Sequence, residues 1–146
     1  MNYRTIQLTN KNVGAVSVGA FMPLGVITRK VCCGNGTTKT FDVVSSGADT
    51  IVLNEKGYYD ILYSASFVAA AAGIITATLI ANGEPIYTIS ETVAEGETVN
   101  LTLPHTIRVF DNCSSCPTNN PLSIQIELGG IAVTNGTSNL SITRVY

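Results

Sequence analysis

The sequence predicts an all-β protein built as an antiparallel β-sandwich, and two features carry that prediction. Apolar and polar residues alternate over short segments, most clearly from Leu122 to Leu128, where Ser123, Gln125 and Glu127 separate four aliphatic residues. Gly, Asn and Pro residues, which favour turns, separate these segments at short and regular intervals. We count about eight to ten strands and no helix, which is typical of a jelly roll.

The longest apolar stretch, residues 57–83, is interpreted as two strands. Four alanines and a glycine at residues 69–73 join them, and such small residues suit either a close approach of two backbones or a tight bend. Asn82-Gly83 is a hairpin signal. A membrane helix is the alternative, but Asp60 and Glu84 flank the stretch where basic residues are expected, so no membrane span is predicted.

The rest of residues 1–146 is expected to belong to the same single domain, with residues 1–12 as an N-terminal arm or edge strand. Two strand-like pieces are expected on either side of the break at residues 22–25, and Pro104-His105 is expected to interrupt another extended region. A hairpin turn is predicted at Asn135-Gly136. The other expected strands are residues 39–44, 50–53, 85–89, 98–103, 106–110 and 139–146.

The composition favours an oligomer and disfavours a nucleic-acid partner. Of the residues, 45% are hydrophobic and only 12% are charged, whereas a small monomer usually carries more charge on its surface. A net charge of −2 and a pI of about 5.2 provide no basic footprint for nucleic acid. The first residues lack the basic start and apolar run of a secretory signal, so synthesis in a cytoplasm is expected.

The four cysteines leave three interpretations open. Cys113 and Cys116 have the spacing of a zinc half-site or a redox pair, and Cys32 and Cys33 are the candidates for the other half of such a site. Adjacent cysteines rarely direct both sulfurs to one tetrahedral ion, and no second pair has the same spacing. Free thiols, a disulfide and a metal site all remain, and a reducing cytoplasm favours the first.

No cofactor and no catalytic residue is predicted. His105 is the single histidine, which cannot form a multi-histidine metal site, and a structural role is expected for it. The acidic cluster at Glu91, Glu95 and Glu97 is interpreted as a solvated loop. The Asn-rich segment 111–120 offers oxygen atoms that calcium uses, but the spacing matches no calcium loop.

The order of the segments resembles a known family. A Gly-Tyr-Tyr-Asp-Ile-Leu-Tyr block from Gly57 to Tyr63, a strand ending in Asn-Gly, a Leu-rich strand and a terminal Leu-Ser-Ile-Thr-Arg-Val strand are similar to the tumour necrosis factor and complement globular-head jelly roll. The resemblance covers residues 48–146 and is strongest to bacterial and bacteriophage versions, such as spore-surface glycoprotein domains and phage head-fibre or tail proteins.

The resemblance implies a homotrimer in which Tyr58, Tyr59, Tyr63 and Phe67 pack within or between subunits. Because the chain lacks a collagen-like stalk, a structural protein on a bacteriophage particle is expected, in contact with a major capsid or fibre protein. Loops at residues 32–39, 91–97 and 111–120 would contact a host-surface glycan or protein. The alternatives are a spore or cell-surface adhesion module and a small sugar-active enzyme that uses Glu91 or Glu95.

Overall fold

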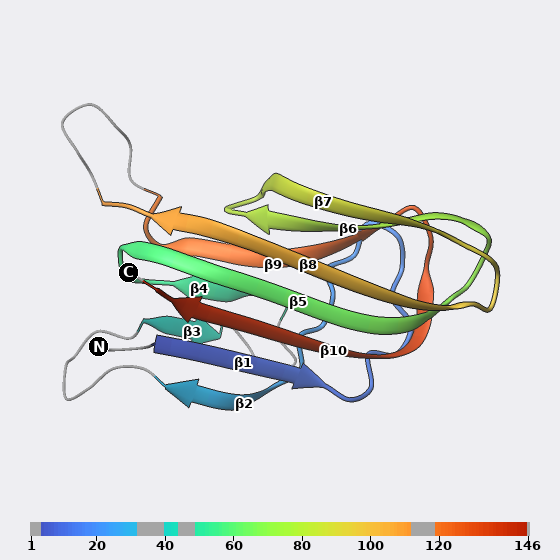
Figure 1. The fold of residues 1–146 in the computed structure, drawn as a ribbon, viewed down its shortest axis with the longest axis horizontal. Coiled ribbons are helices and arrows are strands. Elements are labelled where there is room, and N and C mark those ends of the chain that lie inside the picture. Colours follow the sequence, from blue (N-terminus) through green and yellow to red (C-terminus); the bar gives the residue numbers. More distant parts are fainter. Residues whose placement is uncertain (1–3, 32–39, 44–48, 112–118, 146) are drawn as a thin grey trace.

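Two five-stranded antiparallel sheets pack face to face in the computed structural model, which describes residues 4–31, 40–43, 49–111 and 119–145 (Figure 1). Sheet A has the order β2 (Val26–Val31), β1 (Arg4–Asn10), β10 (Val133–Arg144), β5 (Gly57–Ala69) and β8 (Thr98–Val109). Sheet B has the order β3 (Phe41–Val43), β4 (Ile51–Leu53), β9 (Leu122–Gly129), β6 (Gly73–Ala81) and β7 (Glu84–Val93). The prediction of an all-β jelly roll is confirmed.

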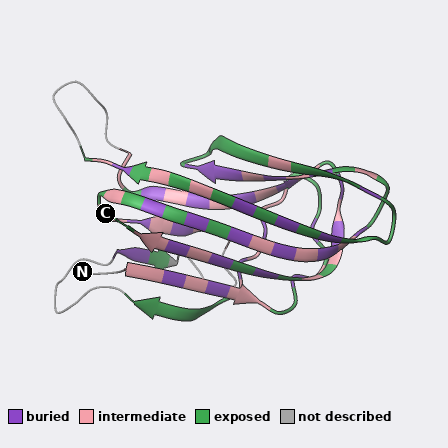
Figure 2. Ribbon diagram, in the orientation of Figure 1, coloured by how far each residue is buried: buried purple, intermediate pink, exposed green. Residues whose placement is uncertain are grey.

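The core lies between the two sheets because alternate residues of each strand point inward, as the alternation of buried and exposed bands in Figure 2 shows. In β9 the predicted alternation is confirmed, since Leu122, Ile124, Ile126 and Leu128 are buried and the residues between them are only partly so. Complete burial of one such aliphatic side chain contributes about 1.5–3 kcal/mol. The hydrophobic pattern therefore fixes which face of each strand meets the core.

The stretch 57–83 forms two strands, as predicted, but they belong to different sheets. β5 lies in sheet A and β6 in sheet B, so the alanines at residues 70–72 form a bend that carries the chain from one sheet to the other. The Asn82-Gly83 hairpin is confirmed, because both residues have positive φ angles, of 48° and 81°, and β6 pairs with β7.

The structure corrects two expectations at the chain ends. β1 lies between β2 and β10, so Arg4–Asn10 form an internal strand and not an arm or edge strand. Asn135-Gly136 is not a hairpin turn but lies within β10, where the pairing with β5 shifts register between Thr134 and Thr137. A Cβ atom on Gly136 would lie 2.5 Å from the carbonyl oxygen of Ser66, which explains the glycine.

The expected break at Pro104-His105 was also wrong, because β8 continues through both residues and pairs Pro104 with Leu62. β8 is an edge strand of sheet A, and edge strands accommodate proline because a backbone N–H that faces away from the sheet has no interstrand partner to lose.

Residues 13–24 do not form the expected strand but close one side of the sandwich. Val16 forms an isolated bridge with Val133 in sheet A, and the Met22 N–H donates to the Ile126 carbonyl in sheet B at 2.7 Å. Met22 and Leu24 are buried in the core. In sheet A this segment therefore lies beside β10, on the side where β1 pairs with it. In sheet B it lies beside β9, on the side where β4 pairs with it.

Candidate interaction surface

The outer face of sheet A carries little charge apart from its edge strand β2, which holds Arg29 and Lys30. On β1, β5, β8 and β10 the residues that alternate with the buried ones are mostly Thr, Ser and Asn, and Asp60 and Arg108 are the only charged ones along β5 and β8. Leu62 and Tyr58 on the central strand β5 remain 45% and 43% exposed. Depletion of charge around exposed apolar side chains is characteristic of the centre of a protein–protein interface.

This face is also uneven, with two shallow depressions. One, of about 350 Å³, is lined mainly by hydroxyl and amide side chains that include Ser64, Asn100 and Asn139. The other, of about 410 Å³, lies beside Leu62 and Pro104. The second depression also holds Asp60, His105 and Ser141, but no hydrogen bond joins these three side chains among the described residues. Asp60 accepts from Thr106, and the His105 ring stacks on Tyr87, so the hydrogen-bonded nucleophile–base pair that nucleophilic catalysis uses is not formed here.

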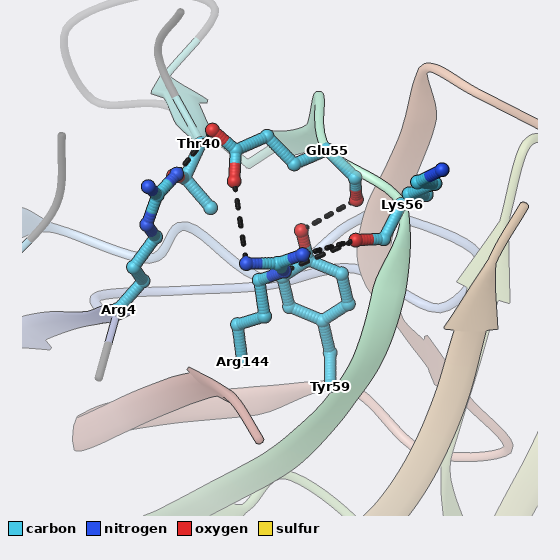
Figure 3. Close-up of polar contacts among 6 residues, drawn as sticks. All are labelled: Arg4, Thr40, Glu55, Lys56, Tyr59 and Arg144. Atoms are coloured by element: carbon cyan, nitrogen blue, oxygen red, sulfur yellow. Dashed lines mark hydrogen bonds and ion pairs between the residues drawn. The ribbon is translucent and has the colours of Figure 1, made fainter. Parts of the chain in front are cut away.

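An ion-pair cluster closes the end of the sandwich where β1 begins and β10 ends (Figure 3). Arg4 Nη1 donates to Glu55 Oε1 and, at 2.9 Å, to Thr40 Oγ1. Arg144 Nη1 lies 3.6 Å from Glu55 Oε2, while its Nε and Nη2 donate to the Lys56 carbonyl at 3.0 and 2.8 Å. One carboxylate thus holds the arginines of two paired strands.

The four aromatic residues singled out from the sequence divide between the core and the surface. Tyr59, Tyr63 and Phe67 are buried between the sheets, and Tyr58 lies on the outer face of sheet A. The Tyr59 hydroxyl donates to the Glu55 carbonyl at 2.6 Å. Burial raises the pKa of Tyr59 to about 12, against the opposing effect of Arg144, and burial also raises the pKa of Tyr63. Tyr58 is therefore the one that another chain can contact.

His105 contributes to the closure of the sandwich on its other side. Its ring stacks on that of Tyr87, with centroids 5.1 Å apart and planes 18° apart. His105 belongs to β8 and Tyr87 to β7, so this contact joins the free edges of the two sheets. Sequence reasoning did not find this partner, because no short-range pattern relates the two positions.

The described residues include only part of the three predicted contact loops. Glu91 lies in β7 and not in a loop, whereas Glu95 and Glu97 lie in the turn before β8, where Glu97 Oε2 accepts from the Ala94 N–H at 2.7 Å. Asn119 Oδ1 accepts a hydrogen bond from the Phe110 N–H, and Asn119 Nδ2 donates to the Arg108 carbonyl. The Asn119 side chain is therefore bound to the backbone at the end of β8.

The four cysteines, with most of the loops 32–39 and 111–120, lie outside the described residues. Within the described ranges, no group of three or more His, Cys, Asp or Glu side chains is arranged to hold a metal ion. The same part of the chain contains no helix long and apolar enough to cross a membrane.

Comparison with known proteins identifies the fold. No protein-family model and no curated protein sequence matches the chain. The globular domain of the zebrafish complement 1qA protein superposes with a TM-score of 0.70 at 8% identity, over 98% of each chain. Eiger TNF from S. frugiperda gives a TM-score of 0.73 at 7% identity, over 100% of this chain and 94% of that one.

The vertex protein of the phage PRD1 has a TM-score of 0.59 at 12% identity, over 98% of this chain and 97% of that one. Identities this low establish the fold alone. The chain therefore has a jelly roll of the C1q/TNF type, and the resemblance inferred from the sequence is confirmed for the fold.

Proposed function

We propose that this protein is a non-enzymatic structural protein on the surface of a bacteriophage particle, displayed as a homotrimer. It would act as a head decoration, a head fibre or a receptor-contacting tip. The observation that carries the proposal is the weakly charged outer face of sheet A around the exposed Leu62, where Asp60 is the one charged side chain on the central strand β5. The likeness of the fold to a phage vertex protein supports the particle surface as its location.

In this proposal the outer face of sheet A forms the contact between subunits. A stable interface buries about 800 Å² on each partner and excludes charge from its centre. The patch around Leu62, Pro104 and Ser141 meets the second requirement in part, because Asp60 is the one Asp, Glu, Lys or Arg side chain in its lining and its carboxylate accepts a hydrogen bond from Thr106 at 2.7 Å. The hydroxyl groups nearby supply hydrogen bonds without the desolvation cost of full charges.

Trimeric display makes weak contacts effective. Three copies of a loop surface on each trimer, and many trimers on each particle, raise the avidity without a strong single site. The partners of the displayed trimer would be a major capsid or fibre protein and, at the exposed loops, a glycan or protein of the host surface.

Immunogold labelling tests the proposed location. Antibody against this chain is expected to label the surface of intact, purified phage particles. A chain found only in the cell lysate, with no label and no peptide from the purified particles, would contradict the proposal.

A further inference from the structure

A pocket of about 440 Å³ lies at the end of the sandwich where β5 begins and β8 ends. Its walls include Lys56, Tyr58, Arg108, Phe110, Asp111 and Arg144. We call it the end pocket. Its volume is in the range of small-molecule sites, and it is large enough for one or two sugar rings.

The end pocket is electropositive on a chain whose net charge is −2. Lys56, Arg108 and Arg144 line it with one acid, Asp111, and the Arg4–Glu55 pair lies directly behind Arg144. Four basic and two acidic side chains leave an excess of two positive charges at this end. The Asp111 carboxylate is further occupied by a hydrogen bond from Asn120 Nδ2 at 2.9 Å.

Arg108 is held in place, but its guanidinium has no hydrogen-bond acceptor among the described residues. Its guanidinium carbon lies 5.7 Å from the centroid of the Tyr58 ring and 5.8 Å from that of Phe110. Among the described residues, no carboxylate or carbonyl oxygen accepts from its side chain, and the same holds for Lys56. Contacts with two aromatic rings restrain the guanidinium, so a ligand that pairs with it loses less side-chain entropy.

Arg144 has a different role in the same pocket. Its donors already meet the Lys56 carbonyl and Glu55, so it is fixed and contributes positive charge with few free N–H groups. The hydrogen bonds to the Lys56 carbonyl also hold the backbone of the turn that carries the Lys56 side chain. Within the described part of the chain, the side-chain donors of the pocket that have no acceptor are therefore those of Arg108 and Lys56.

We propose that the end pocket binds an anionic group, a carboxylate or a phosphate, carried by an acidic glycan. The planar guanidinium of Arg108 pairs with two oxygens of the anion, and the Lys56 ammonium provides a second, more flexible charge. This inference gives a ligand chemistry to the proposed surface-display function and rests on that function for its biological role. It involves the start of β5 and the end of β8, whereas the proposed contact between subunits is centred on Leu62.

Titration calorimetry at low ionic strength tests the site with the full chain. The probes are a galacturonic acid oligosaccharide for the carboxylate and mannose 6-phosphate for the phosphate, with a neutral galactose oligosaccharide as the uncharged control. Arg108→Gln is expected to weaken binding of the charged probe by about tenfold or more, which corresponds to about 1.4 kcal/mol.

Arg29→Gln is the matched control, because Arg29 is exposed on β2, distant from the end pocket, and its removal changes the net charge equally. The site is supported if either charged probe binds, if Arg108→Gln weakens that binding and if Arg29→Gln preserves it. The probe that binds identifies the source of the anion. No binding by either probe, or equal losses in the two variants, would overturn it.

Light scattering on the same samples separates this inference from the proposed function. A single-chain mass with intact anion binding would refute the trimer and leave the site. A trimer with no binding would refute the site alone.

Discussion

Replacement of Glu55 by Gln removes the single carboxylate between Arg4 and Arg144 while preserving the size of the side chain. Glu55 is 16% exposed at its side chain, and the two arginines are 21% and 25% exposed, so water screens the three charges only in part. The Tyr59 hydrogen bond goes to the Glu55 backbone and survives the substitution. The variant therefore tests the ion pairs alone.

The expected loss follows from the contacts. A hydrogen bond between charged groups contributes about 1.5–3 kcal/mol, and the second arginine adds an attraction that the cost of desolvation largely offsets. Because Gln retains an acceptor oxygen, we expect the free energy of unfolding to fall by about 2 kcal/mol. For a chain of this length that loss corresponds to a decrease in Tm of about 4–8 °C.

Urea denaturation at pH 7 and matched protein concentration measures the loss, with Glu95→Gln as the control. Glu95 is exposed and forms no ion pair among the described residues, so its replacement should change the free energy of unfolding by less than about 0.5 kcal/mol. A Glu55→Gln loss as small as that of the control would show that the cluster is an ordinary surface pair and refute the reasoning.

Three further substitutions address the interface, the core and a turn. Leu62→Asp should break the trimer, since an unpaired carboxylate at a buried contact costs about 3 kcal/mol or more, while Ile74→Asp on the outer face of sheet B should leave the mass unchanged; equal masses would exclude sheet A as the contact. The pKa of Tyr59 is raised to about 12, so its contribution to stability is complete below pH 10 and is lost between pH 10 and 12. Tyr59→Phe should reduce that decline by about 1.4 kcal/mol per pH unit in urea denaturation, and an unchanged slope would contradict the assignment. Gly25→Ala should destabilise the chain by at least about 1 kcal/mol more than Gly14→Ala in thermal unfolding; both have positive φ, but only at Gly25 would a Cβ lie 2.2 Å from a backbone oxygen of β1, so equal losses would count against the predicted clash.

The sequence was sufficient for the strands whose own pattern decides their burial. β9 alternates without exception, and Asn82-Gly83 lies between two strands that pair directly. At these places the local preference and the tertiary structure agree, so periodicity and turn chemistry identify the element.

The predictions that failed concern residues whose structure is determined by pairing with strands distant in the sequence. Asn135-Gly136 has the composition of a hairpin turn, yet β10 continues past it because β5 pairs on both sides of the shift in register. Pro104 is tolerated inside β8 only because that strand lies at an edge of sheet A. Neither the neighbour of a strand nor its position in a sheet can be read from the strand itself.

The end cluster and the end pocket had no local signal either. Arg4 and Arg144 are opposite each other only because β1 pairs with β10, and Arg108 meets Tyr58 through the pairing of β8 with β5. The Tyr block was recognised as central, but only the structure separates Tyr58 on the surface from its buried neighbour Tyr59.

Light scattering of the purified protein, with and without a reducing agent, tests the central claim most directly. We predict a mass three times the 15.4 kDa of one chain that reduction does not change, because the proposed contact is the outer face of sheet A and not the cysteines. A single-chain mass, or a larger mass that falls to that of one chain on reduction, would contradict the proposed trimer.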